Sequence, residues 1–111
     1  MTRTGVLEPT GPNRSLATYR RPDPLDARTP AEFTLIMRRY LVWAGAWSYQ
    51  ELEYLCGGLV GARTFQRVLE GDRLPRLVLL MAFVTACVGE DEAESRHWLA
   101  AWRALRDRTG A

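Results

Sequence analysis

The sequence contains no lysine, a single histidine and only two cysteines. Every side-chain cation is therefore an arginine, whose planar guanidinium can make bidentate hydrogen bonds. His97, Cys56 and Cys87 are too few, and too widely spaced along the chain, to form a His/Cys metal site. We expect both cysteines to be reduced thiols on apolar helix faces. The sequence predicts neither a bound metal nor a cofactor.

Long apolar runs and catalytic motifs are also missing. The longest largely apolar stretch, Leu77 to Val88, is shorter than the roughly 20 residues of a membrane-spanning helix. No N-terminal apolar run resembles a signal peptide, so we expect a cytoplasmic protein with no membrane contact. No phosphate-binding loop or carboxylate pair stands out, and His97 has no evident nucleophile as partner, so an enzyme is not expected. No small-molecule site is evident either.

The chain is 111 residues long, which suits one domain, and it divides into two parts. Residues 1–28 contain four prolines and few large apolar residues, so burial cannot repay the entropy of ordering them. We predict a flexible tail here. Its five arginines against three acidic residues account for the whole net charge of +2. Residues 29–108, the predicted folded domain, are therefore neutral.

Capping signals and apolar periodicity predict that this domain is helical throughout. Three segments combine an N-cap residue with a glutamate three positions later, and they begin at Thr29, Ser48 and Asp91. Apolar residues recur at helical spacing after each cap, and glycines end the segments. No alternating strand pattern occurs. The sequence predicts an all-α fold, a compact bundle of five helices in which two short central helices form a helix-turn-helix.

Three segments carry a resemblance to a known family: "SYQELEYLCGG", "ARTFQRVLEGDRLPR" and "LVLLMAFVTACVGEDEAESRHWLAAW". Over residues 29–107 the chain resembles the XRE-like helix-turn-helix domains, the group that includes the lambda-type phage repressors. The likeness is greatest to the version common in actinobacterial proteins. The sequence departs from the family's pattern in the long apolar turn "GGLVG" and in Glu53, which stands where repressors often have alanine.

The resemblance implies a DNA-binding function with a recognition helix at about residues 62–70. It places Ala62, Arg63, Thr64 and Arg67 opposite base edges. It places another group of residues closer to the DNA phosphates: Gln66, Arg73 and, at the start of the supporting helix, Ser48, Tyr49 and Gln50. Phe65 and Val68 fall at core positions.

The chemistry of these residues agrees with that implication. Arg63 and Arg67 are four residues apart and share a helix face. Arginine bidentate to guanine is the commonest specific base contact in the major groove. The alternative is an ordinary solvated face on which Arg67 pairs with Glu70, three residues on. Arg38 and Arg39 could contact the DNA backbone or only cover the first helix.

The predicted function is therefore a sequence-specific transcriptional regulator that binds double-stranded DNA in the nucleoid. Useful specificity implies a homodimer, for which Trp98 and Trp102 are candidate contacts. The alternative is that all four tryptophans, Trp43, Trp47, Trp98 and Trp102, are core residues. The acidic segment Gly89–Glu94 is expected to face away from DNA. The alternative is a helix-turn-helix fold reused to bind a protein partner of the transcription machinery, with Leu59 and Val60 in the turn as its apolar contact.

Overall fold

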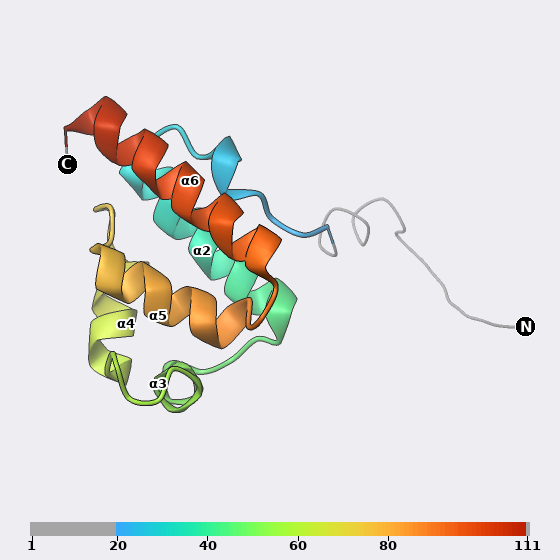
Figure 1. The fold of residues 1–111 in the computed structure, drawn as a ribbon. Helices are drawn as coiled ribbons and strands as arrows, with labels where there is room; N and C mark the ends of the chain where they lie inside the picture. Colours follow the sequence, from blue (N-terminus) through green and yellow to red (C-terminus); the bar gives the residue numbers. More distant parts are fainter. Residues whose placement is uncertain (1–19, 111) are drawn as a thin grey trace, which may run out of the picture.

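The computed structural model describes residues 20–110, and the part of the predicted tail before residue 20 lies outside the described residues. Within this range the chain forms five α-helices and one short 3-10 helix, with no strand, which confirms the all-α prediction (Figure 1). The elements are η1 (Pro24–Asp26), α2 (Pro30–Ala44), α3 (Tyr49–Leu55), α4 (Ala62–Leu69), α5 (Leu77–Cys87) and α6 (Glu92–Thr109).

Each of the three predicted N-caps begins a helix. The Thr29 hydroxyl accepts from the Glu32 N–H at 3.1 Å, and the Asp91 carboxylate accepts from the Glu94 N–H at 3.0 Å. Only at α3 do both halves of a capping box form, between Ser48 and Glu51. These bonds satisfy backbone donors that a helix start leaves without partners. The predicted starting points of these three helices are therefore confirmed.

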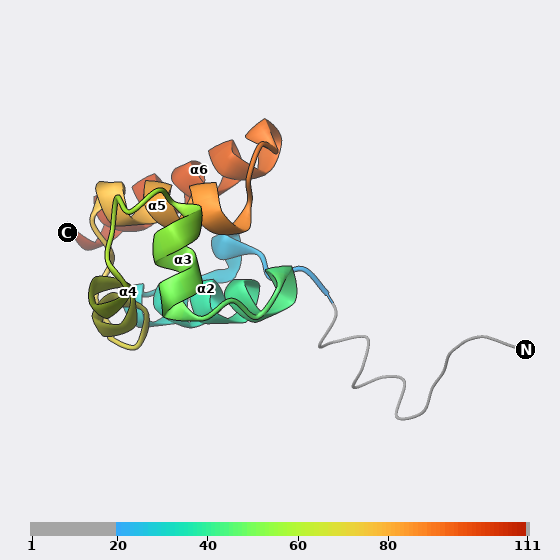
Figure 2. The same cartoon turned by 90° about the horizontal axis from the view of Figure 1, so that it is seen from below.

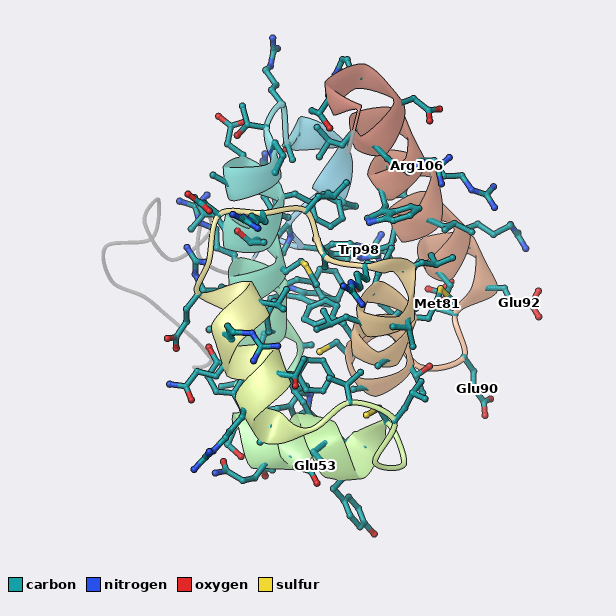
Figure 3. All side chains as sticks on the ribbon, turned by 90° about the vertical axis from the view of Figure 1, so that its left-hand side faces the viewer. Glu53, Met81, Glu90, Glu92, Trp98 and Arg106 are labelled. Carbon is teal, nitrogen blue, oxygen red and sulfur yellow. The ribbon has the colours of Figure 1, made fainter. Side chains whose placement is uncertain are left out.

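Trp98 of α6 lies at the centre of the core (Figure 3). Its ring meets Phe33 of α2 edge-on with centroids 5.6 Å apart, and Tyr40 of the same helix at 5.1 Å. Phe83 of α5 approaches it at 5.6 Å. Aromatic rings in such edge-to-face contact add to the free energy gained by burial. One indole thus joins α2, α5 and α6.

The predicted tail boundary is wrong for residues 20–28, because this segment packs on the domain. Pro24 and Ala27 are buried, and η1 lies against α6 and α2. The His97 Nε2 and the Asp23 Oδ1 are 2.6 Å apart, which gives His97 a partner that sequence reasoning did not find. Arg21 adds an ion pair to Glu94 at 3.7 Å. Composition did not predict that Pro24 and Ala27 of this segment are buried against the helices.

The four tryptophans divide between core and surface. Trp98 and Trp102 are buried, so the idea that they form a dimer contact is wrong. The Trp102 Nε1 donates to the Pro75 carbonyl at 2.7 Å and ties the connection between α4 and α5 to α6. Trp43 is 40% exposed beside Tyr40, and Trp47 is half-buried against Gly45.

Candidate nucleic-acid interface

Helices α3 and α4 form the predicted helix-turn-helix. Figure 1 shows α3 end-on and α4 from the side, and Figure 2, a quarter turn away, shows the reverse, so the two helices cross steeply. They are joined by residues 56–61, a longer connection than the usual 3–4-residue turn. Gly57 and Gly58 adopt φ angles of 71° and 78°, which glycine adopts without strain. These two glycines therefore end α3, and their N–H groups bond back to the Tyr54 and Glu53 carbonyls.

The apolar turn residues separate in the structure. Val60 is buried in the core, whereas Leu59 is 60% exposed. The two apolar residues of "GGLVG" thus have different surroundings. The Val60 side chain anchors the turn on the core, and the Leu59 side chain faces solvent.

The inner face of α4 holds the helix on the core. Phe65 and Leu69 are fully buried, and Val68 is half-buried. Periodicity predicted Phe65 and either Val68 or Leu69 in the core, and the family resemblance favoured Val68; the fully buried residue is Leu69, with Val68 partly buried against the core. Because residues 65 and 69 are one helical turn apart, both side chains meet the core on one face.

The first turn of α4 is capped from the neighbouring helix. The N-cap position is Gly61, which has no side chain to offer. The Glu53 Oε1 accepts from the Ala62 N–H at 2.9 Å instead, and Figure 3 shows Glu53 at the end where α4 begins. A carboxylate at a helix N-terminus interacts favourably with the helix dipole. The sequence identified Glu53 only as a difference from the family's pattern and did not predict that it caps α4.

The last turn of α4 is held by α2. Arg38 donates to the Leu69 carbonyl, and the Thr34 hydroxyl donates to the Gly71 carbonyl at 2.8 Å. These bonds satisfy acceptors that the end of a helix leaves open. Arg38 therefore has a structural contact within the protein, whereas Arg39, the next residue, is exposed. Helix α4 is anchored at both ends and along its inner face.

The outer face of α4 carries exposed polar side chains. Arg63, Gln66 and Arg67 are all exposed, at positions that share one side of the helix. Among residues 20–110, neither arginine forms an ion pair. Glu70, the expected partner of Arg67, instead accepts a hydrogen bond from the Tyr49 hydroxyl at 3.0 Å. Both guanidinium groups can therefore meet an external acceptor.

The remaining predicted contact residues have different surroundings. Partial burial, together with the bond to Glu70, raises the pKa of Tyr49 above its ordinary value, and its hydroxyl proton is donated to Glu70. Ser48 is exposed, but its oxygen accepts from the Glu51 N–H at 3.1 Å. Ala62 and Thr64 are half-buried, whereas Gln50 and Arg73 are exposed.

Charge is distributed unevenly around the domain. Arg73 and Arg76, in the connection after α4, are exposed and without ion pairs within the described range. Glu90 and Glu92 lie at the turn between α5 and α6, on the other side of α5 from α4 (Figure 3). The acidic segment therefore faces away from the arginines, in accordance with the expectation. The exposed arginines of α4 and of the following connection thus lie apart from the acidic segment, with Glu53, Glu70 and Asp72 as the exposed acidic residues near them.

Other kinds of site lack support in the described part of the chain. Residues 20–110 contain no group of three or more His, Cys, Asp or Glu side chains that could hold a metal ion. No helix in this range combines the length and apolar character needed to cross a bilayer. Both cysteines are half-buried thiols.

Comparisons of the chain with protein-family models, with curated proteins and with solved structures found no match.

Proposed function

We propose that this protein is a sequence-specific transcriptional regulator that binds double-stranded DNA by inserting α4 into the major groove. One observation carries the proposal. Helix α4 is fixed to the domain at both ends, yet the guanidinium groups of Arg63 and Arg67 on its outer face have no ion-pair partner within residues 20–110. Side chains on a rigid element lose less entropy on binding than side chains on a mobile loop.

The dimensions and the chemistry of α4 suit the major groove. A helix of 8 residues is about 12 Å long, similar to the roughly 12 Å width of the groove. Arg63 and Arg67 each offer a bidentate pair of donors to guanine, and Thr64 offers a methyl group to thymine or a hydroxyl to phosphate. The resemblance to XRE-like repressors supports the same assignment of these residues.

Phosphate contacts would come from both sides of α4. Arg73 follows α4, Gln50 lies in the first turn of the supporting helix α3, and both are exposed. So few cations predict weak binding by one domain, with non-specific affinities of about 10⁻⁴–10⁻⁶ M. A homodimer on half-sites about 34 Å apart would supply the missing affinity.

Selection from a random duplex pool tests sequence specificity. The full chain should enrich a short motif that contains guanines, and the Arg63→Ala chain should lose the preference at one position. Arg103→Ala serves as the control, because Arg103 is an exposed α6 arginine without an ion pair among residues 20–110. A pool that stays random with the unmodified chain would contradict sequence-specific reading.

The alternative is a helix-turn-helix fold used to bind a protein of the transcription machinery. The observation in its favour is exposed apolar surface beside α4, at Leu59 and at Tyr54, which is 83% exposed. The substitution that tests it is Leu59→Ser, since serine at the buried Val60 would also destabilise the fold. Leu59→Ser should leave DNA binding intact if α4 reads DNA, and it should abolish partner capture if the turn is the contact.

A further inference from the structure

A groove lies between α4 and the start of α5, beside the proposed DNA-reading face. Its volume is about 680 Å³. Helix α4 contributes Thr64, Arg67 and Val68, positions three and four residues apart that share one side of the helix. The other wall comes from the α4–α5 connection and the first turn of α5. The groove is therefore a second surface of α4, and Arg67 lies on the border between the two.

The walls of this groove are apolar and its rim is basic. The apolar lining residues are Val60, Val68, Leu74, Pro75, Val78 and Leu79. The charged lining residues are Arg67, Arg73, Arg76 and Asp72. None of the four forms an ion pair within residues 20–110, so the rim carries two uncompensated positive charges.

Apolar surface continues from the groove over the outer side of α5. Val78 is 51% exposed, and Leu77 and Met81 are also exposed; Met81, four residues after Leu77 and three after Val78, neighbours both on the helix surface. Such a continuous apolar patch marks a binding surface more often than scattered exposed residues do. The walls are fixed, because Trp102 holds the Pro75 carbonyl and Thr34 holds the Gly71 carbonyl.

We propose that this groove binds an acidic segment of a partner protein whose apolar side chains fill it. Carboxylates of the segment pair with Arg73 and Arg76 at the rim, and its apolar residues pack on Val68, Leu74 and Val78. A DNA backbone would satisfy the arginines but would leave the apolar walls uncovered. A small molecule would need most of its surface buried, which a groove open along α5 does not provide.

The same geometry makes the bound segment compete with DNA for the protein. Arg73 pairs with a carboxylate of the segment in this proposal and with phosphate in the DNA complex, and Arg67, which reads a guanine, also lines the groove, so segment and DNA require the same arginines. The acidic segment therefore displaces DNA. This competition rests on the proposed DNA-binding function, whereas binding of the segment does not.

Two synthetic 15-residue peptides test the proposal on the full chain. One has leucines along one helix face and glutamates elsewhere, and the other has the same leucines with lysines elsewhere. We expect the glutamate peptide to shift the backbone NMR signals of Val68, Leu74 and Val78 saturably, and the lysine peptide to leave them unchanged. Equal shifts with both peptides, or shifts confined to another face, would overturn the proposal.

Variants separate the groove from the DNA face. Val78→Asp and Arg76→Ala should each weaken peptide binding about tenfold, whereas Arg103→Ala should not change it. Val78→Asp should retain DNA binding, and duplex DNA should release the peptide from the unmodified chain. Peptide binding without any DNA binding would contradict the proposed function but would still support the groove as a peptide-binding site. Groove shifts produced by duplex DNA or by free glutamate, but not by the peptide, would assign the groove to those ligands instead.

Discussion

The Glu53 carboxylate of α3 accepts a hydrogen bond from the Ala62 N–H, the first backbone donor of α4, at 2.9 Å. This contact couples the two helices of the motif where the long turn would otherwise leave them loosely connected. It also places a negative charge at the end of the helix proposed to enter DNA. The same residue thus stabilises the motif and opposes a phosphate approaching that end.

Substitution of Glu53 should separate these two effects. Glu53→Gln keeps an acceptor for the Ala62 N–H and removes the charge, so we expect a stability loss of only about 0.3–1 kcal/mol. Duplex affinity should rise, because the repulsion of phosphate is removed. Glu53→Ala also removes the cap and should cost about 0.5–2 kcal/mol. Urea unfolding gives the stabilities and fluorescence anisotropy gives the affinities. Weaker DNA binding by Glu53→Gln at unchanged stability would contradict this assignment.

Two leucines of α5 provide a matched test of the core. Leu80 is fully buried, whereas Leu77, almost one turn earlier, is 43% exposed. Leu80→Ala should lower the free energy of unfolding by about 2–5 kcal/mol, because it opens a cavity. Leu77→Ala should change it by no more than about 0.5 kcal/mol. Urea titrations of both variants, followed by tryptophan fluorescence, measure the difference. Equal losses would mean that α5 is rotated relative to the described packing.

The fold could be predicted from the sequence where the signals are local. Caps at Thr29, Ser48 and Asp91 lie within a few residues of the backbone groups that they bind, so a single segment contains the whole signal. The packing of residues 20–28 could not be predicted in this way. It depends on contacts such as Asp23 with His97, which are 74 residues apart.

The candidate site shows the same division. The exposure of Arg63 and Arg67 follows from helical periodicity, because Phe65 and Leu69 must face the core. The roles of Glu53 and Arg38 do not follow, since both depend on how neighbouring helices cross. The choice of Leu69 over Val68 also depends on that crossing. Periodicity places both residues near the core face but does not say which one is covered.

The Asp23–His97 contact predicts a pH-dependent contribution to stability. Partial burial raises the pKa of Asp23, but hydrogen bonds from the Leu25 N–H and His97, with the charges of His97 and Arg21, outweigh it and lower the pKa. The contribution is therefore present above the ordinary carboxyl value of 3.8 and is lost as the pH falls below it. Asp23→Asn should cost under about 1 kcal/mol at neutral pH, since the pair is partly exposed. Urea unfolding of both chains from pH 7 to pH 3 should show the difference shrinking, and a constant difference would contradict this account.

Burial raises the pKa of the Cys87 thiol to about 12, from an ordinary value of 9.0. The reactive thiolate is therefore scarce at neutral pH. In a Cys56→Ser background, the folded protein should react with a thiol reagent at pH 8 far more slowly than the urea-unfolded chain. The raised pKa also implies stability that is complete below pH 9 and declines as the pH rises toward 12. Cys87→Ala should show a smaller alkaline loss, and rapid labelling of the folded chain would contradict the described burial.

The salt dependence of binding to a labelled random duplex tests the central claim most directly, with the double variant Arg63→Ala/Arg67→Ala beside Arg103→Ala/Arg108→Ala. All four arginines are exposed, but only the first pair lies on α4. The account predicts binding at low salt that weakens steeply as salt is added, with affinity lowered in the α4 variant and unchanged in the α6 variant at each salt concentration. Absence of binding at low salt, or equal binding by the two double variants, would contradict the proposal that α4 enters DNA.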